Sequence, residues 1–269
     1  MKNIYYIIAF TLFISLLAGC EKFESSPNQA HDNNTPRHIN QRNIDKLLAR
    51  ADQDDTIRIV FTGDSQRYYD EAELLVKKVN SMEDVDFLIV AGDLTDFGLR
   101  QEFEWINDIF SGLTVPYISA IGNHDVIGNG KKTFEYMFGV DNFSFVYKRT
   151  KFIFHNTNSR EYHFKGNIPD MNWLAQECQP QPGVEYIVPV SHVPPYDGDF
   201  DKNLEQSYAQ TLRNTKGLLI SLHGHHHHTN DQYPYEDGVR YLNSNAVDKR
   251  VFMLLEIYNG KVHKTPVSY

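Results

Sequence analysis

Side chains of the kinds that bind metal ions follow short apolar runs at five places in this 269-residue sequence. Carboxylates and imidazoles together are donors that suit Mn, Fe or Zn. Any one of these positions, taken singly, is explained better by a helix cap, a turn or a buried polar residue. Five of them in one chain favour a metal site instead. They are Asp64, Asp93, the run Asn123-His124-Asp125, His192, and the run Gly224-His225-His226-His227.

The segments before these positions are predicted to be strands of a buried sheet. Short apolar runs alternate with amphipathic stretches, which are expected to form helices at about residues 71–80 and 99–110. This alternation predicts an α/β fold. Because ligands bind at the carboxyl ends of strands in open α/β sheets, the five groups are expected at one edge of the structure. The predicted strands cover residues 57–62, 87–91, 116–121, 186–190 and 218–222.

The second half of the chain is expected to add a hairpin and closing strands. Apolar runs at residues 143–147 and 152–156 flank a polar turn, and a helix is predicted around Trp173. Further strands are predicted at residues 241–243, 251–257 and 261–267. The length is within the range of one large domain.

The N-terminus has the features of an export signal. Lys2 precedes an apolar stretch at residues 4–18, which is shorter than the roughly 20 residues that a membrane-spanning helix needs. The ending Leu17-Ala18-Gly19-Cys20 resembles a bacterial lipoprotein signal, in which Cys20 carries the lipid; a signal cleaved without lipidation is the alternative. The sequence therefore predicts a signal at residues 1–19, a flexible polar tether at residues 20–43 and a globular domain at residues 44–269, anchored by lipid to the cell envelope.

Charge and cysteine content narrow the function classes further. The formal net charge of −9 and the lack of a Lys/Arg-rich run argue against nucleic acid as a partner. Cys178 is the second of two cysteines, so lipidation of Cys20 would leave no partner for an intramolecular disulfide. Nothing in the sequence specifies an oligomeric state.

The ordered motifs resemble those of the calcineurin-like metallophosphoesterases. That family has Asp-x-His, Gly-Asp, Gly-Asn-His-Asp/Glu, a lone His and Gly-His-x-His, and the likeness extends over about residues 57–229 with four of the five motifs intact. The run from Gly92 to Gly98 is most similar to the branch that contains cyclic-nucleotide phosphodiesterases. The resemblance implies an α/β fold of two packed mixed β-sheets flanked by helices, and hydrolysis of a phosphate-ester small molecule.

The resemblance also implies a role for each motif residue. Two divalent cations, about 3.5–4 Å apart and bridged by Asp93, would activate a water molecule for attack on phosphorus. His124 would protonate the leaving oxygen or stabilise its charge, and Asp125 would orient its imidazole. His226 is excluded from the ligands, because alternate residues of an extended segment point the same way. The implied ligands are Asp64, Gln66, Asp93 and His227 for the first cation, and Asp93, Asn123, His192 and His225 for the second.

Gln66 departs from the family pattern, which has His at this position. A neutral amide oxygen is a harder and weaker donor than imidazole, so the first site is expected to bind its cation more loosely and to lean toward Mn or Mg. Arg67 and Tyr196 are candidate substrate contacts, with exposed loop residues as the alternative. The leading function is hydrolysis of phosphomonoesters or phosphodiesters outside the cytoplasm. Cyclic-nucleotide hydrolysis and a non-catalytic metal-binding scaffold are the alternatives.

Overall fold

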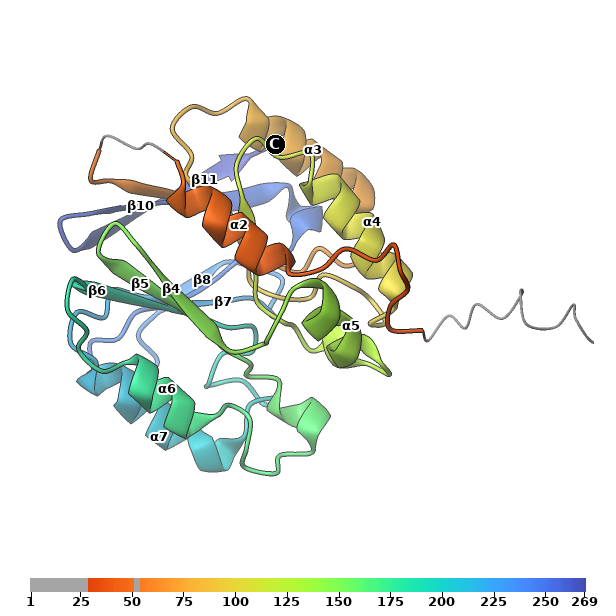
Figure 1. The fold of residues 1–269 in the computed structure, drawn as a ribbon. Coiled ribbons are helices and arrows are strands. Elements are labelled where there is room, and N and C mark those ends of the chain that lie inside the picture. Colours follow the sequence, from red (N-terminus) through yellow and green to blue (C-terminus); the bar gives the residue numbers. More distant parts are fainter. Residues whose placement is uncertain (1–28, 51–53) are drawn as a thin grey trace, which may run out of the picture.

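The computed structural model describes residues 29–50 and 54–269, and two mixed β-sheets packed face to face form its centre. Helices cover the outer face of each sheet (Figure 1). This arrangement confirms the predicted α/β sandwich. The predicted signal and Cys20 lie outside the described residues.

The first sheet carries the earliest predicted strands at its centre. Its order is β11-β10-β1-β2-β3, with β1, β2 and β3 parallel and β10 antiparallel to β1. All four residues of β2 are buried, as expected for a strand covered on both faces. The strands are β1 (Ile57–Thr62), β2 (Phe87–Val90), β3 (Tyr117–Ser119), β10 (Val251–Tyr258) and β11 (Lys261–Ser268).

The second sheet has the order β4-β5-β6-β7-β9-β8. The parallel run β5, β6, β7 and β9 lies at its centre, and the antiparallel strands β4 and β8 form its edges. Parallel strands end at the same edge of a sheet, so β6 and β7 deliver their following loops to one side. The strands are β4 (Phe143–Tyr147), β5 (Thr150–Phe154), β6 (Tyr186–Val190), β7 (Ser221–His223), β8 (Asn230–Gln232) and β9 (Tyr241–Asn243).

An aromatic core joins the two sheets. The ring of Phe87 in the first sheet packs edge-on against Phe145, Tyr147 and Phe152 in the second, with centroid separations of 5.3–6.1 Å. Edge-to-face contacts of this kind add to the stabilisation that burial provides. The packing holds the carboxyl ends of strands from both sheets close to one another.

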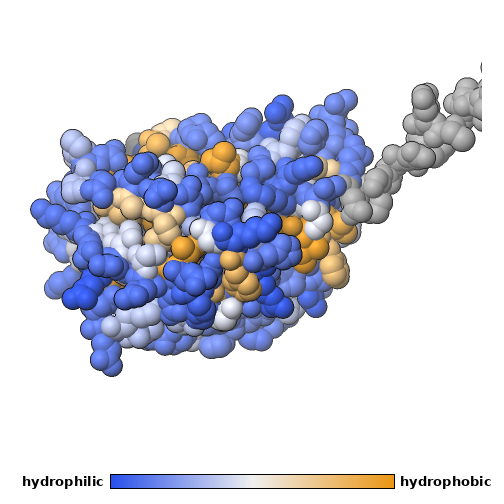
Figure 2. Space-filling view, turned by 90° about the horizontal axis from the view of Figure 1, so that it is seen from below, coloured by the Kyte–Doolittle hydropathy of each residue, from blue (hydrophilic) through white to orange (hydrophobic). Residues whose placement is uncertain are grey.

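Helices form the two outer layers, and α2 packs beside the edge strand β3, with Ile44 and Leu47 in the core between the sheets. In Figure 1, α3 and α4 lie above the first sheet and α6 and α7 lie below the second. The surface on the lower side is mostly hydrophilic, with separate small hydrophobic patches, as expected for helices whose apolar faces are turned inward (Figure 2). The helices are α2 (Ile39–Leu48), α3 (Tyr69–Asn80), α4 (Arg100–Phe110), α5 (Gly130–Met137), α6 (Met171–Glu177) and α7 (Lys202–Asn214).

The globular domain begins earlier than the predicted boundary at residue 44. The ring of His31 stacks on Tyr136 at 3.9 Å, Asp32 forms an ion pair with Arg100, and Ile39 is buried. Residues 31–43 therefore pack on the domain, and the tether predicted at residues 20–43 is too long at its C-terminal end. These contacts connect the polar segment to α4 and α5, which local periodicity cannot reveal. None of the helices in the described residues is long and apolar enough to cross a membrane.

His155, at the end of β5, is held neutral in the core of the second sheet. Its Nδ1–H donates to the carbonyl of Ile153 at 3.3 Å, and its Nε2 accepts from the Tyr208 hydroxyl at 2.9 Å. Burial lowers the pKa of His155 to about 4. An unfolded histidine has a pKa of about 6.5 and takes up a proton first as the pH falls.

We therefore expect His155 to make the protein acid-sensitive between pH 6.5 and 4. Because its folded pKa lies below the unfolded value, its unfavourable contribution grows as the pH falls through this window, reaching about 2–3 kcal/mol near pH 4. Urea unfolding in chelator at pH 7 and pH 4.5 measures this loss. His155→Gln should lose less unfolding free energy across the interval than wild type, and equal losses would rule out the assignment.

Candidate metal centre

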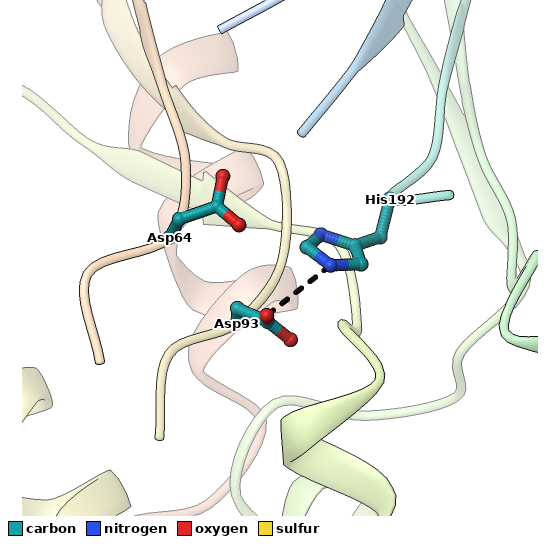
Figure 3. A group of neighbouring side chains, drawn as sticks. All are labelled: Asp64, Asp93 and His192. Atoms are coloured by element: carbon teal, nitrogen blue, oxygen red, sulfur yellow. Dashed lines mark ion pairs between the residues drawn. The ribbon is translucent and has the colours of Figure 1, made fainter. Parts of the chain in front are cut away.

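Loops that follow five strands converge at the edge where the two sheets meet. Asp64 follows β1 and Asp93 follows β2, while His192 follows β6 of the second sheet. Figure 3 shows these three side chains pointing toward one another, with His192 Nε2 3.3 Å from Asp93 Oδ2. All three are buried and have donor atoms within 4.8 Å of one another. The predicted grouping of strand ends is therefore present in the structure.

The backbone is left-handed at several of the predicted ligands. Asp64, Asp93, His225 and His227 have φ values of 53°, 54°, 72° and 57°. Residues with a Cβ rarely adopt this conformation, and such residues cluster at functional sites when the surrounding structure enforces it. The backbone at these four residues is thus held in a conformation that glycine usually occupies in a simple turn.

Glycines allow these loops to approach closely. A Cβ added to Gly122 would lie 2.0 Å from the backbone nitrogen of Asp93, and one added to Gly224 would lie 2.6 Å from the carbonyl oxygen of Ala91. Both are backbone contacts that cannot yield without moving a strand end. The loops after β2, β3 and β7 therefore need glycine at these points to bring their donors together.

The donors predicted for the second cation lie around Asn123. Its Oδ1 is 3.0 Å from His192 Nε2 and 3.1 Å from His225 Nδ1. His192 Nδ1–H donates to the carbonyl of Ala91 at 2.6 Å, which directs Nε2 into the group. Asp93 completes the set through Oδ2. One carboxylate, one amide oxygen and two imidazoles thus face a common point.

The donors predicted for the first cation lie on the other side of Asp93. His227 Nε2 is 3.4 Å from Asp64 Oδ1, and Gln66 Nε2 donates to Asp93 Oδ2 at 3.3 Å. Gln66 Oε1 is buried and has no hydrogen-bond partner among the described residues. A buried oxygen without a partner is costly, and a cation would satisfy it. The donor set therefore fits a divalent cation at this position.

The charges of the group also favour a cation. Burial raises the pKa of Asp64 to about 8, and the nearby Asp93 carboxylate adds to the rise. Burial alone would lower the pKa of His192, but the Asp93 and Asp64 carboxylates outweigh it and raise the pKa to about 10. Burial lowers the pKa of His225 to about 4, and it also lowers the pKa of His227. Both imidazoles are thus neutral at neutral pH, as metal ligands must be.

Asp96, rather than Asp125, orients the imidazole of His124. The Nδ1–H of His124 donates to the carbonyl of Asp96 at 2.8 Å, and the Asp96 carboxylate lies 3.7 Å from the same nitrogen. This bond leaves Nε2 available to a substrate. Asp96 also forms an ion pair with the half-exposed guanidinium of Arg67. The candidate substrate residue Arg67 is thus at the site, with its charge already paired.

Asp125 holds two ligand loops together. Its buried carboxylate accepts from the backbone nitrogens of Thr95 at 2.9 Å, Leu94 at 3.2 Å and Gly122 at 2.9 Å, and from the Thr95 hydroxyl at 2.9 Å. The prediction that Asp125 orients the His124 ring is therefore wrong. Its position one residue beyond His124 turns the carboxylate back under the loops that follow β2 and β3.

The rings of Tyr196 and His226 lie next to each other, and the His226 ring lies next to that of His225, with centroid separations of 5.9 Å. The Tyr196 hydroxyl bonds to Asn243 Oδ1, and Asn243 Nδ2 donates to the carbonyl of Gly224 at 2.7 Å, so Tyr196 braces the loop that carries His225. His226 Nε2 donates to Asp197 at 2.9 Å, so this ring nitrogen is engaged outside the two proposed donor sets. Sequence reasoning missed Asp96, Asp197 and Asn243. Asp96 belongs to the run from Gly92 to Gly98, whereas nothing in the sequence around Asp197 and Asn243 indicates a role for them.

A sequence profile for calcineurin-like phosphoesterases matches residues 57–229. No curated protein sequence matches the chain. Two solved structures share its fold with a TM-score of 0.58 each. GAP50, the anchor in the inner membrane complex of Plasmodium, is 13% identical over 79% of this chain and 84% of that chain. A dimetal phosphatase from Danio rerio is 12% identical over 79% of this chain and 99% of that chain. Purple acid phosphatase PPD1 from yellow lupin has a TM-score of 0.52 and 14% identity, over 80% of this chain and 54% of that one.

Proposed function

The chain belongs to the calcineurin-like phosphoesterase family, because the family profile covers more than half of it, and on that premise we propose that it hydrolyses phosphate esters with two divalent cations. One observation carries the proposal. The donors of both sets converge on Asp93, and the buried Gln66 Oε1 among them has no partner in the described part of the chain. When bound, two cations supply Lewis acidity that activates water and neutralises phosphate oxygens.

Each donor set has its own residues. Asp64, Gln66, Asp93 and His227 would hold the first cation, and Asp93, Asn123, His192 and His225 the second. Three imidazoles and two carboxylates suit Mn, Fe or Zn, and the amide oxygen of Gln66 makes Mn or Mg acceptable in the first site. The weaker donor at Gln66 predicts that the first cation leaves more readily than the second.

His124 supplies the proton for the leaving oxygen. Its Nδ1–H is committed to the Asp96 carbonyl at 2.8 Å, so the proton that moves is the one on Nε2. The Asp96 carboxylate lies 3.7 Å from the same Nδ1 and flanks the ring on the side away from the substrate-facing nitrogen. The backbone nitrogen of His124 donates to Asp93 Oδ1 at 2.9 Å, which fixes the imidazole relative to the donor groups.

The substrate proposed is a phosphomonoester or phosphodiester outside the cytoplasm, met by a protein held on the cell envelope through lipid at Cys20. The sequence Leu17-Ala18-Gly19-Cys20 supports the anchor. The run Gly92 to Gly98 favours a cyclic nucleotide as the alternative substrate. GAP50 is described as an anchor, so the fold by itself does not distinguish an enzyme from a scaffold. The presence of His124 and of the proposed ligand residues in this chain favours an enzyme.

Metal-depleted protein reconstituted with Mn, Fe, Zn or Mg tests the proposal. Bis(4-nitrophenyl) phosphate, 4-nitrophenyl phosphate and 3′,5′-cyclic AMP separate diester, monoester and cyclic-nucleotide hydrolysis. We expect turnover of at least one substrate to require added cation and to be lost again in chelator. Absence of turnover of all three by protein that binds two cations per chain would favour the scaffold. Turnover that persists in chelator would refute the two-cation site.

A further inference from the structure

Two carboxylates outside the ligand motifs face the far side of the His225 ring. Asp197 and Asp199 lie in the loop between β6 and α7. His225 Nε2 is 3.5 Å from Asp197 Oδ1 and 3.6 Å from Asp199 Oδ2. The other ring nitrogen, Nδ1, is 3.1 Å from Asn123 Oδ1 within the second donor set. The imidazole therefore lies between the proposed second cation site and a pair of carboxylates.

The two carboxylates are themselves held in place. The backbone nitrogen of Asp199 donates to Asp197 Oδ1 at 2.8 Å, and His226 Nε2 donates to Asp197 Oδ2 at 2.9 Å. Arg160 donates to both carboxylate oxygens of Asp199, at 3.1 and 3.0 Å. The two carboxylates therefore act on the His225 ring through their negative charge. Their distances of 3.5 and 3.6 Å from Nε2 are beyond the usual hydrogen-bond length.

The neutral imidazole of His225 has one proton, and its location decides whether the ring can bind a cation. A proton on Nδ1 would be donated to Asn123 Oδ1, which would leave no lone pair for the cation and would direct the Nε2 lone pair at two carboxylates. A proton on Nε2 is attracted to the carboxylates and leaves the Nδ1 lone pair among the donors. The carboxylates thus favour the tautomer that binds metal.

We propose that Asp197 and Asp199 are positioning residues that hold His225 in its Nε2–H tautomer, with Nδ1 directed at the second cation. The tautomer preference depends only on residues of this chain, whereas its use for a cation rests on the proposed function. Asp197, Asp199 and His225 are also close enough to form a cation site of their own. That arrangement is disfavoured, because Arg160 already pairs with Asp199 and a ring bound through Nδ1 keeps its proton on Nε2.

The test combines histidine-ring NMR with metal binding. In metal-free full-length protein labelled with ¹⁵N-histidine, we expect the His225 ring to be the Nε2–H tautomer, its signals being assigned by their absence in His225→Gln. The double substitution Asp197→Asn and Asp199→Asn removes both charges at nearly constant size. It should move the proton toward Nδ1 and weaken binding of the second Mn by about 10–100-fold. Asp55→Asn, exposed at the opposite end of β1, is the matched control and should change neither readout.

Four outcomes decide the matter. An unchanged tautomer in a double variant that unfolds at the wild-type urea midpoint would overturn the positioning role. Binding of three Mn per wild-type chain and two per variant chain would also overturn the positioning role, because the carboxylates would then be metal ligands themselves. A tautomer shift with weakened Mn binding supports the proposal in full. A tautomer shift in protein that binds no Mn would support the positioning of His225 and refute the proposed function.

Discussion

Asp93→Asn is expected to abolish turnover and to remove most of the bound metal. Asp93 Oδ2 lies 3.3 Å from both His192 Nε2 and Gln66 Nε2, so this carboxylate is the one group that both proposed donor sets share. An amide has the same shape but lacks the negative charge that a bridge between two cations requires. We expect metal content to fall from two cations per chain to one or none.

Asparagine is the informative replacement because of the backbone at this position. Asp93 has a φ of 54°, a conformation that asparagine adopts readily and alanine does not. Its Oδ1 can still accept from the His124 backbone nitrogen. The metal-free variant should therefore unfold within about 2 kcal/mol of metal-free wild type. Metal content by mass spectrometry, turnover and urea unfolding are the three measurements, with Asp55→Asn as the charge-matched control.

A purely structural role of Asp93 predicts the opposite result for metal content and turnover. If Asp93 only tied its loop to its neighbours, the substitution would alter stability and leave metal content and turnover close to wild type. Full activity in Asp93→Asn would contradict the site as described. Loss of activity with unchanged metal content would limit the error to the bridging role.

His124→Gln is expected to slow hydrolysis in proportion to the leaving group's need for a proton. Removal of a positioned general acid costs about 10²–10⁴-fold in rate. A simple alkyl phosphate, whose alkoxide is a poor leaving group, should show this loss. 4-Nitrophenyl phosphate should be affected far less, because nitrophenolate departs without protonation. The ring makes its hydrogen bond to Asp96, and so metal content should be preserved.

A comparison of two substrates in one variant separates a proton donor from a structural histidine. His263→Gln, at an exposed position of β11, is the control for loss of an imidazole and should leave both rates unchanged. Equal losses for alkyl and nitrophenyl substrates, or loss of metal, would show that His124 acts on the site's geometry and not on the leaving oxygen.

Local patterns explain which elements could be predicted. Strands β1, β2 and β6 are largely apolar runs followed by chemically distinctive residues, so both the strand and its proposed ligand were visible in the sequence. Helices α5 and α7 were missed. Of the 13 residues of α7, only Tyr208, Ala209 and Leu212 are buried, and this helix is stabilised chiefly by packing on the second sheet.

By itself the sequence predicted the class of fold from the spacing of its apolar residues, and the resemblance of its short motifs to a known family indicated the proposed metal donors. The tertiary structure decided which groups act on those donors. The Asp96 carbonyl at the His124 ring, the Asp125 carboxylate beneath two loops and the carboxylates behind His225 are contacts between loops of different strands. Such contacts depend on how two sheets and their loops pack together, and periodicity along one segment contains no information about that packing.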